Sequence, residues 1–149
     1  MLREIIPMLI LVGFAACTMG AEAGFEKDIL KTSEGDLEIT FIGHGTLMLS
    51  YSSMIIHFDP FRRLADYTKL PKADIIFITH EHHDHLDADA ITAIQKDGTQ
   101  IIVTEKVRES IPTGTVMNNG DAMEMSGIKI KAIPAYNLAH KRDNGQPFH

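Results

Sequence analysis

The chain has 149 residues, of which 44% are hydrophobic, so it is long enough for one domain with a hydrophobic core. Its formal charge of −6 arises from 20 acidic and 14 basic side chains, and no cluster of lysine and arginine stands out, which makes nucleic acid a poor partner. The single cysteine excludes an internal disulfide framework and any cysteine-rich zinc module, so a bound metal would need nitrogen and oxygen ligands.

The N-terminal segment has the pattern of an export signal. Arg3 precedes an apolar run from Ile5 to Ala16, and small residues follow it. The run covers 12 positions and is interrupted by Pro7, which falls short of the roughly 20 residues that a membrane-spanning helix needs. We therefore expect residues 1–23 to be a signal peptide and the mature chain to be exported, to the periplasm or another extracytoplasmic place.

Two cleavage patterns are present in this segment. The sequence FAAC at 14–17 resembles a bacterial lipobox, which would make residues 1–16 a lipoprotein signal and attach a lipid anchor to Cys17. The sequence AEA at 21–23 instead suits ordinary signal peptidase. We favour the lipoprotein; the alternative is that Cys17 is an ordinary small residue of the signal.

The next segment, residues 24–36, is polar and is expected to be a flexible linker to a domain that starts at residue 37. From there, apolar residues alternate and then cluster in runs of strand length, which predicts strands at 37–42, 46–51 and 54–58. Short turns with glycine or serine separate these runs. The three strands should therefore form an antiparallel meander.

A continuous β-branched run at 73–79, ADIIFIT, is typical of a strand covered on both faces. Asp87 then has the position of an N-cap for a helix that Gly98 ends. The elements expected after it are a strand at 100–103, a short helix at 105–110 and strands at 115–117, 122–125 and 128–133. This alternation of helix and strand predicts an α/β class with a mixed sheet.

Residues 80–85, HEHHDH, hold four histidines and one aspartate directly after the predicted strand. Side chains two apart in an extended chain point to the same side, so His80 and His82 can bind one metal ion together. Asp84 and His85, beyond a bend, can bind a second ion. Two neighbouring ions can ionise a bridging water near neutral pH, and this water then acts as a nucleophile.

Other interpretations of the cluster are weaker. The zincin motif His-Glu-x-x-His fails because Asp84 stands where its second histidine is needed. A solvated histidine-rich patch that scavenges metals is another alternative. Glu81 and His83 are expected to face outward, and His44 and His57, each taken singly, are more often structural residues than ligands.

The pattern His80-x-His82-x-Asp84-His85, after an apolar strand and a threonine, resembles the signature of the metallo-β-lactamase superfamily. The likeness covers residues 37–149. It implies an α/β fold, the αββα sandwich, represented by its N-terminal half and truncated at its C-terminus. It also implies a dinuclear zinc site that hydrolyses an ester, lactone, amide or phosphodiester bond of a small molecule through metal-bound hydroxide.

Two further segments carry the same resemblance. ITFIGHGTLMLS resembles the opening hairpin of the lactonase-like and uncharacterised hydrolase branches, with His44 in the turn. IIHFDPF resembles the strand that ends in Asp-Pro, whose aspartate, here Asp59, typically braces the metal-binding loop.

The resemblance also implies a ligand set. His80 and His82 would bind the first ion with a later histidine, for which we favour His149 over His140. Asp84 and His85 would bind the second ion, and Asp84 would orient the nucleophile as a catalytic residue.

The second ion's other two ligands belong to the second half of the family's fold, so we expect this chain to hold one zinc ion tightly and a second weakly. The rival hypothesis, from another class of function, is a noncatalytic exported lipoprotein that only binds metal.

Overall fold

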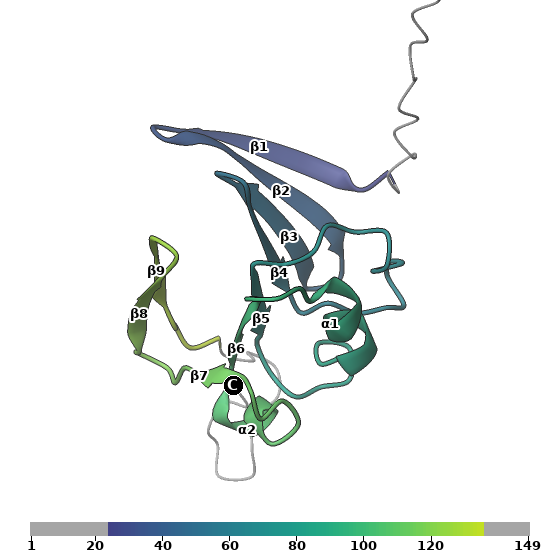
Figure 1. Ribbon diagram of the computed structural model, residues 1–149, viewed down its shortest axis with the longest axis vertical. Coiled ribbons are helices and arrows are strands. Elements are labelled where there is room, and N and C mark those ends of the chain that lie inside the picture. The colour runs from purple at the N-terminus through teal and green to yellow at the C-terminus, as the bar shows by residue number, and fades with distance from the viewer. Residues whose placement is uncertain (1–23, 136–149) are drawn as a thin grey trace, which may run out of the picture.

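The computed structural model describes residues 24–135; the predicted signal peptide with Cys17, and the candidate ligands His140 and His149, lie outside the described residues. A seven-stranded sheet with the order β1-β2-β3-β4-β5-β6-β7 forms the framework, and β8 and β9 form a separate two-stranded sheet (Figure 1). None of the helices in the described range is long and apolar enough to cross a membrane.

The first four strands are antiparallel, and the following three run parallel to β4. The strands of the large sheet are β1 (Glu26–Thr32), β2 (Gly35–Gly43), β3 (Thr46–Tyr51), β4 (Met54–Phe58), β5 (Ile75–Ile78), β6 (Gln100–Val103) and β7 (Thr115–Val116). The remaining elements are α1 (Ala88–Ile94), α2 (Glu105–Arg108), β8 (Ala122–Met125) and β9 (Ile128–Lys131). The predicted meander is confirmed, and so is the α/β class.

The prediction of a flexible linker at 24–36 is wrong. Residues 26–32 form β1, which pairs along its whole length with β2. All seven side chains of β1 are exposed, so the strand has no buried face to produce the alternation that marks a strand in sequence. Backbone pairing holds it in place, together with ion pairs from Lys27 to Glu38 at 3.0 Å and from Lys31 to Asp36 at 2.6 Å.

Both faces of the parallel part of the sheet are covered, as the apolar run at 73–79 predicts. Ile76 and Ile78 pack in one core with the buried face of α1. Ile75 and Phe77 point to the opposite face, where they pack in a second core that includes side chains of β8 and β9. Figure 1 shows α1 and the β8–β9 hairpin on opposite sides of the sheet.

The loop between β5 and α1 carries the histidine cluster and is fixed at both ends. At its start, β5 lies between β4 and β6 in the middle of the sheet. At its end, Asp87 caps α1, because its carboxylate accepts hydrogen bonds from the backbone N–H groups of Asp89 and Ala90. The same carboxylate accepts the N–H of Arg62 at 3.0 Å, which joins the cluster loop to the loop after β4.

Candidate metal centre

The backbone of the cluster is a turn. After β5 the chain bends at Glu81, and the N–H groups of His85 and Leu86 both donate to the carbonyl oxygen of His82, at 2.9 and 2.8 Å. The exit is therefore bent, and not extended as the sequence argument assumed. The bend still brings the expected pair together, with His80 Nε2 3.1 Å from His82 Nδ1.

Asp59, the residue after β4, holds the cluster loop in place through hydrogen bonds. Its side chain is 4% exposed, and its Oδ1 accepts the N–H of Thr79 at 2.7 Å. Its Oδ2 accepts the hydroxyl of Thr79 at 2.6 Å and Nδ1–H of His85 at 2.8 Å. Although Asp59, His80 and His85 have donor atoms close enough to share an ion, both oxygens of Asp59 are already engaged, so we assign it the role of a brace.

These hydrogen bonds determine which imidazole nitrogens can accept a metal. The hydroxyl of Thr79 has one hydrogen, which goes to Asp59, so its oxygen accepts from Nδ1–H of His80 at 2.9 Å. This leaves Nε2 of His80 unprotonated, so it accepts Nδ1–H of His82 at 3.1 Å, and a metal ion bound between the two nitrogens would displace that hydrogen. His85 gives its Nδ1 hydrogen to Asp59 and likewise keeps the lone pair of Nε2 for a ligand. Metal-binding histidines are typically fixed by a second hydrogen bond of this kind.

Asp84 lies between three imidazoles. Its Oδ2 is 3.2 Å from Nε2 of His44 and 3.9 Å from Nε2 of His85, and its Oδ1 is 3.9 Å from Nδ1 of His83. A hydrogen bond from its own backbone N–H holds the pKa of the Asp84 carboxyl below its usual value, against the opposing effect of desolvation, and protonated forms of His85, His83 and His44 would lower it further. The carboxylate is thus kept ionised, which is the form that binds metal.

The expected outward residues do face outward. Glu81 is exposed, and the side chain of His83 is 84% exposed. His57, a residue of β4, is fully buried. Its Nε2 donates to the carbonyl oxygen of Pro71 at 3.1 Å, so its role is structural, as expected. His44 departs from that expectation, because it joins the cluster.

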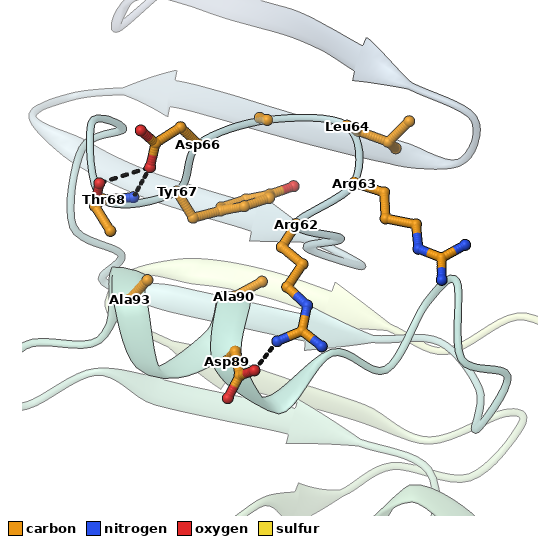
Figure 2. A pocket seen from close by; sticks show the side chains of 10 residues that line it. Arg62, Arg63, Leu64, Asp66, Tyr67, Thr68, Asp89, Ala90 and Ala93 are labelled. Atoms are coloured by element: carbon orange, nitrogen blue, oxygen red, sulfur yellow. Dashed lines mark hydrogen bonds and ion pairs between the residues drawn. The ribbon is translucent and has the colours of Figure 1, made fainter.

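A groove of about 1280 Å³ reaches the cluster. Its lining includes apolar side chains of the sheet and of β9, such as Phe77 and Ile130, together with His80, Glu81 and His82. Another cavity, of about 510 Å³, lies between residues 62–68 and α1 (Figure 2). Among the described residues no histidine lines that cavity, so we place the chemistry at the groove.

The side chains around the smaller cavity satisfy one another. Arg62 points toward α1 and pairs with Asp89, while Asp66 accepts hydrogen bonds from the N–H and hydroxyl of Thr68 (Figure 2). Tyr67 closes the inner wall, and its oxygen accepts the N–H of Phe61 at 3.0 Å. These contacts link the loop after β4 to the cluster loop. The polar side chains named here are paired with each other or with the backbone, so they do not indicate a ligand site.

The comparison with known families decides the assignment. Residues 38–148 match the beta-lactamase superfamily domain. The chain belongs to the beta-lactamase superfamily. The HxHxDH cluster, the Asp-Pro strand end and the hairpin before it all lie within the matched residues.

Relatives within the superfamily carry names of one kind. The chain is 33% identical over 123 residues to a metal-dependent hydrolase of Methanosarcina mazei. This match covers 76% of this chain and 52% of the relative. A metal-dependent hydrolase of Methanopyrus kandleri is 24% identical over 121 residues, covering 74% of this chain and 51% of that one. The chain spans about half the length of the curated relatives it matches.

Solved structures agree with the fold. A protein of Parabacteroides distasonis whose crystal structure is described as that of a metal-dependent hydrolase is 49% identical to this chain. The two structures match with a TM-score of 0.76, and the match covers 80% of this chain and 56% of that one. A metallo hydrolase of Ignicoccus hospitalis is 24% identical with a TM-score of 0.58, covering 74% and 53%, and this likeness supports the fold alone.

His44 is the residue of the centre that sequence reasoning passed over. It stands in the turn Gly43-His44-Gly45, and the signal that could have revealed it is the pair of glycines on either side. Such a pair allows a turn to approach another loop closely, because neither glycine has a Cβ.

Proposed function

We propose that this chain forms part of a zinc-dependent hydrolase that cleaves an ester, lactone, amide or phosphodiester bond of a small molecule. The observation that carries the proposal is the convergence of donor atoms at the end of β5: Nε2 of His80 beside Nδ1 of His82, and the Asp84 carboxylate beside Nε2 of His85. Their pattern belongs to a superfamily in which the matched relatives are named metal-dependent hydrolases.

The donor set fits zinc. Imidazole nitrogen and carboxylate oxygen are both zinc ligands, and the described part of the cluster offers no thiolate that would favour a softer ion. When bound, zinc lowers the pKa of water toward neutrality and stabilises negative charge that develops on the substrate. His80 and His82 would hold the first ion, and Asp84 and His85 the second.

The other residues of the centre prepare these ligands. Asp59 and Thr79 fix the tautomers of His80 and His85 before metal arrives, which reduces the reorganisation that binding requires. Asp84 would also orient the nucleophile while it binds the second ion. The groove at His80 and His82 gives a small substrate access to the same place.

Zinc titration of two single variants tests this function. His82→Ala should weaken zinc binding by about 100-fold or more and abolish hydrolysis, because it removes a ligand. The control His83→Ala removes an imidazole from the same loop that faces solvent. This variant should change neither zinc affinity nor hydrolysis. Wild-type protein would be assayed on nitrophenyl ester, lactone, anilide and phosphodiester substrates.

Two outcomes would contradict the proposal. Equal losses of zinc affinity in both variants would indicate a loose histidine-rich patch. Tight zinc binding without turnover on any of the four substrate classes would favour the rival, a noncatalytic metal-binding lipoprotein.

The third ligand of the first ion is proposed to be His149, with His140 as the alternative; both lie outside the described residues. His149→Ala should then lower the affinity for the first ion as strongly as His82→Ala does. His140→Ala serves as its control. A larger loss of affinity for the first ion in His140→Ala than in His149→Ala would make His140 the third ligand.

We also propose export of the chain, with a lipid anchor on Cys17. The apolar run Ile5 to Ala16 and the small residues before Cys17 support it. Labelled palmitate should be incorporated by the wild type and not by Cys17→Ser. An unprocessed cytoplasmic product that begins at Met1 would contradict both cleavage patterns, whereas an exported but unlabelled product would favour cleavage after residues 21–23.

A further inference from the structure

We propose that His44 is a third protein ligand of the second metal position, alongside Asp84 and His85. The inference rests on the proposed function, because it concerns the same centre. It adds a donor from the β2–β3 turn to a position that the cluster loop alone supplies with only two.

Distances between the donor atoms support a shared ion. Nε2 of His44 is 3.2 Å from Oδ2 of Asp84, and that oxygen is 3.9 Å from Nε2 of His85. One ligand atom from each of the three residues lies within 4.8 Å of the other two. Zinc bonds of about 2.1 Å at tetrahedral angles place ligand atoms about 3.4 Å apart. The three donors are thus close to the spacing that one ion requires.

Packing gives no other reason for an imidazole at position 44. The side chain of His44 is 56% exposed, so it fills no core. Its φ of +51° lies in the left-handed region, which is uncommon for a residue other than glycine. The tight β2–β3 turn accounts for this φ, since Ser52, Ser53 and Ser126 in the other hairpin turns of the described residues also have positive φ; the imidazole at this position is what the turn does not require.

The flanking glycines bring the turn against the cluster loop. Gly43 has a φ of +138°, which favours glycine. A Cβ added to Gly45 would lie 3.1 Å from Cε1 of His85, closer than most such contacts. The rings of His44 and His85 are consequently only 5.2 Å apart, centroid to centroid.

The turn is also tied to the brace of the centre. The hydroxyl of Thr46, the first residue of β3, donates to the carbonyl oxygen of Asp59 at 2.7 Å. Asp59 in turn holds His85 at 2.8 Å through its carboxylate. Asp59 is therefore linked both to His85 and, through Thr46, to the end of the turn that carries His44. With three protein donors, the second ion should be held firmly, and not weakly as the ligand count from the cluster loop suggests.

The test is zinc stoichiometry and affinity of the dialysed protein, with variants that tolerate a positive φ. His44→Gly removes the imidazole and suits the backbone, and His44→Asn adopts the left-handed region readily. Wild-type protein should hold two zinc ions. Both variants should hold one, with the affinity for the second ion reduced by about 100-fold or more. Cobalt absorption should show the loss of one coordination environment while the other persists.

His83→Asn is the matched control, because His83 also lies near Asp84 but faces solvent; it should keep both ions. Second-ion affinity within about tenfold of wild type in the His44 variants would overturn the inference, as would a wild-type protein that holds a single ion. Either result leaves the proposed function intact. Failure of wild-type protein to bind any zinc would instead remove the proposed function itself.

Discussion

His57 in β4 is a histidine whose surroundings oppose its charge. Its side chain is 0% exposed, and burial lowers its pKa to about 4, although the bond to the carbonyl oxygen of Pro71 acts in the opposite direction. Since a carbonyl oxygen only accepts, Nε2 carries the hydrogen, and Nδ1 is left buried without a hydrogen-bond partner among the described residues. The neighbouring ring of Tyr67, 6.1 Å away between centroids, offers no compensating negative charge, because burial raises the pKa of its hydroxyl to about 12.

The folded protein should therefore lose stability in mild acid. The unfolded chain takes up a proton on His57 near its ordinary pKa of 6.5, whereas the folded protein resists protonation until about pH 4. Protonation of the unfolded state thus draws the equilibrium toward unfolding between these values. The free energy of unfolding contributed by this residue is complete above pH 6.5 and falls by about 3 kcal/mol by pH 4. Urea unfolding at several pH values measures it.

His57→Gln supplies the comparison, because glutamine can still donate to Pro71 but does not titrate. The variant should show a shallower decline in unfolding free energy from pH 6.5 to pH 4 than wild type. Parallel pH profiles for the two proteins would show that His57 is not the residue responsible.

Single residues were predictable from sequence where their neighbours along the chain determine their role. Asp87 is an N-cap because the helix follows it directly, and His83 faces outward between the two ligand pairs. His44 was not predictable in this way, because its partners lie some 40 residues later in sequence and only folding brings them near.

At the scale of elements, the β2–β3 turn is the part whose sequence the centre constrains most. Gly45→Ala should weaken zinc binding by about tenfold or more while changing the melting temperature little. The added Cβ would press on Cε1 of His85 at 3.1 Å, and the ring can retreat only by straining its bond to Asp59.

Gly24→Ala is the matched control, since a Cβ at that position meets no atom within 4 Å. Zinc titration and thermal unfolding of both variants separate the two effects. Unchanged zinc affinity in Gly45→Ala would show that the close approach of this turn to His85 does not matter for the centre.

Elements were predictable where burial leaves a periodic pattern. The strand at 54–58 and the strand at 100–103 have the bounds that the sequence indicated, because their apolar residues pack on the core. β1 escaped notice because none of its side chains is buried, and its formation depends on the backbone of β2.

Across the whole molecule, the two faces of the sheet differ where β1 and β2 extend beyond the helices (Figure 1). On one face, Lys27 and Lys31 pair with acidic residues of β2. On the other face, Leu30 lies beside Leu37 across the two strands. Leu30 is 51% exposed and Phe41, on the same face, is 38% exposed. Glu26 and Asp28 also lie on this face, opposite Phe41 and Ile39, so its apolar centre is Leu30 with Leu37. Exposed apolar side chains that lie side by side favour self-association.

We predict that the 149-residue protein associates at increasing concentration through this apolar face. Leu30→Ser should shift it toward the monomer mass of 16.6 kDa, measured by size-exclusion chromatography with light scattering. Ile29→Ser is the control, because Ile29 is similarly exposed, at 57%, but lies on the charged face. A wild-type protein that stays monomeric at every concentration, or equal effects of both substitutions, would contradict the prediction.

The sequence by itself determined the superfamily, the meander, the α/β class and the four cluster residues His80, His82, Asp84 and His85, because these depend on local spacing and periodic burial. Tertiary structure alone decided the tautomers that Asp59 and Thr79 impose, the approach of His44 to Asp84 and the existence of β1. Each of these rests on contacts between segments distant in sequence, where the backbone path, and not the residue type, sets which atoms meet.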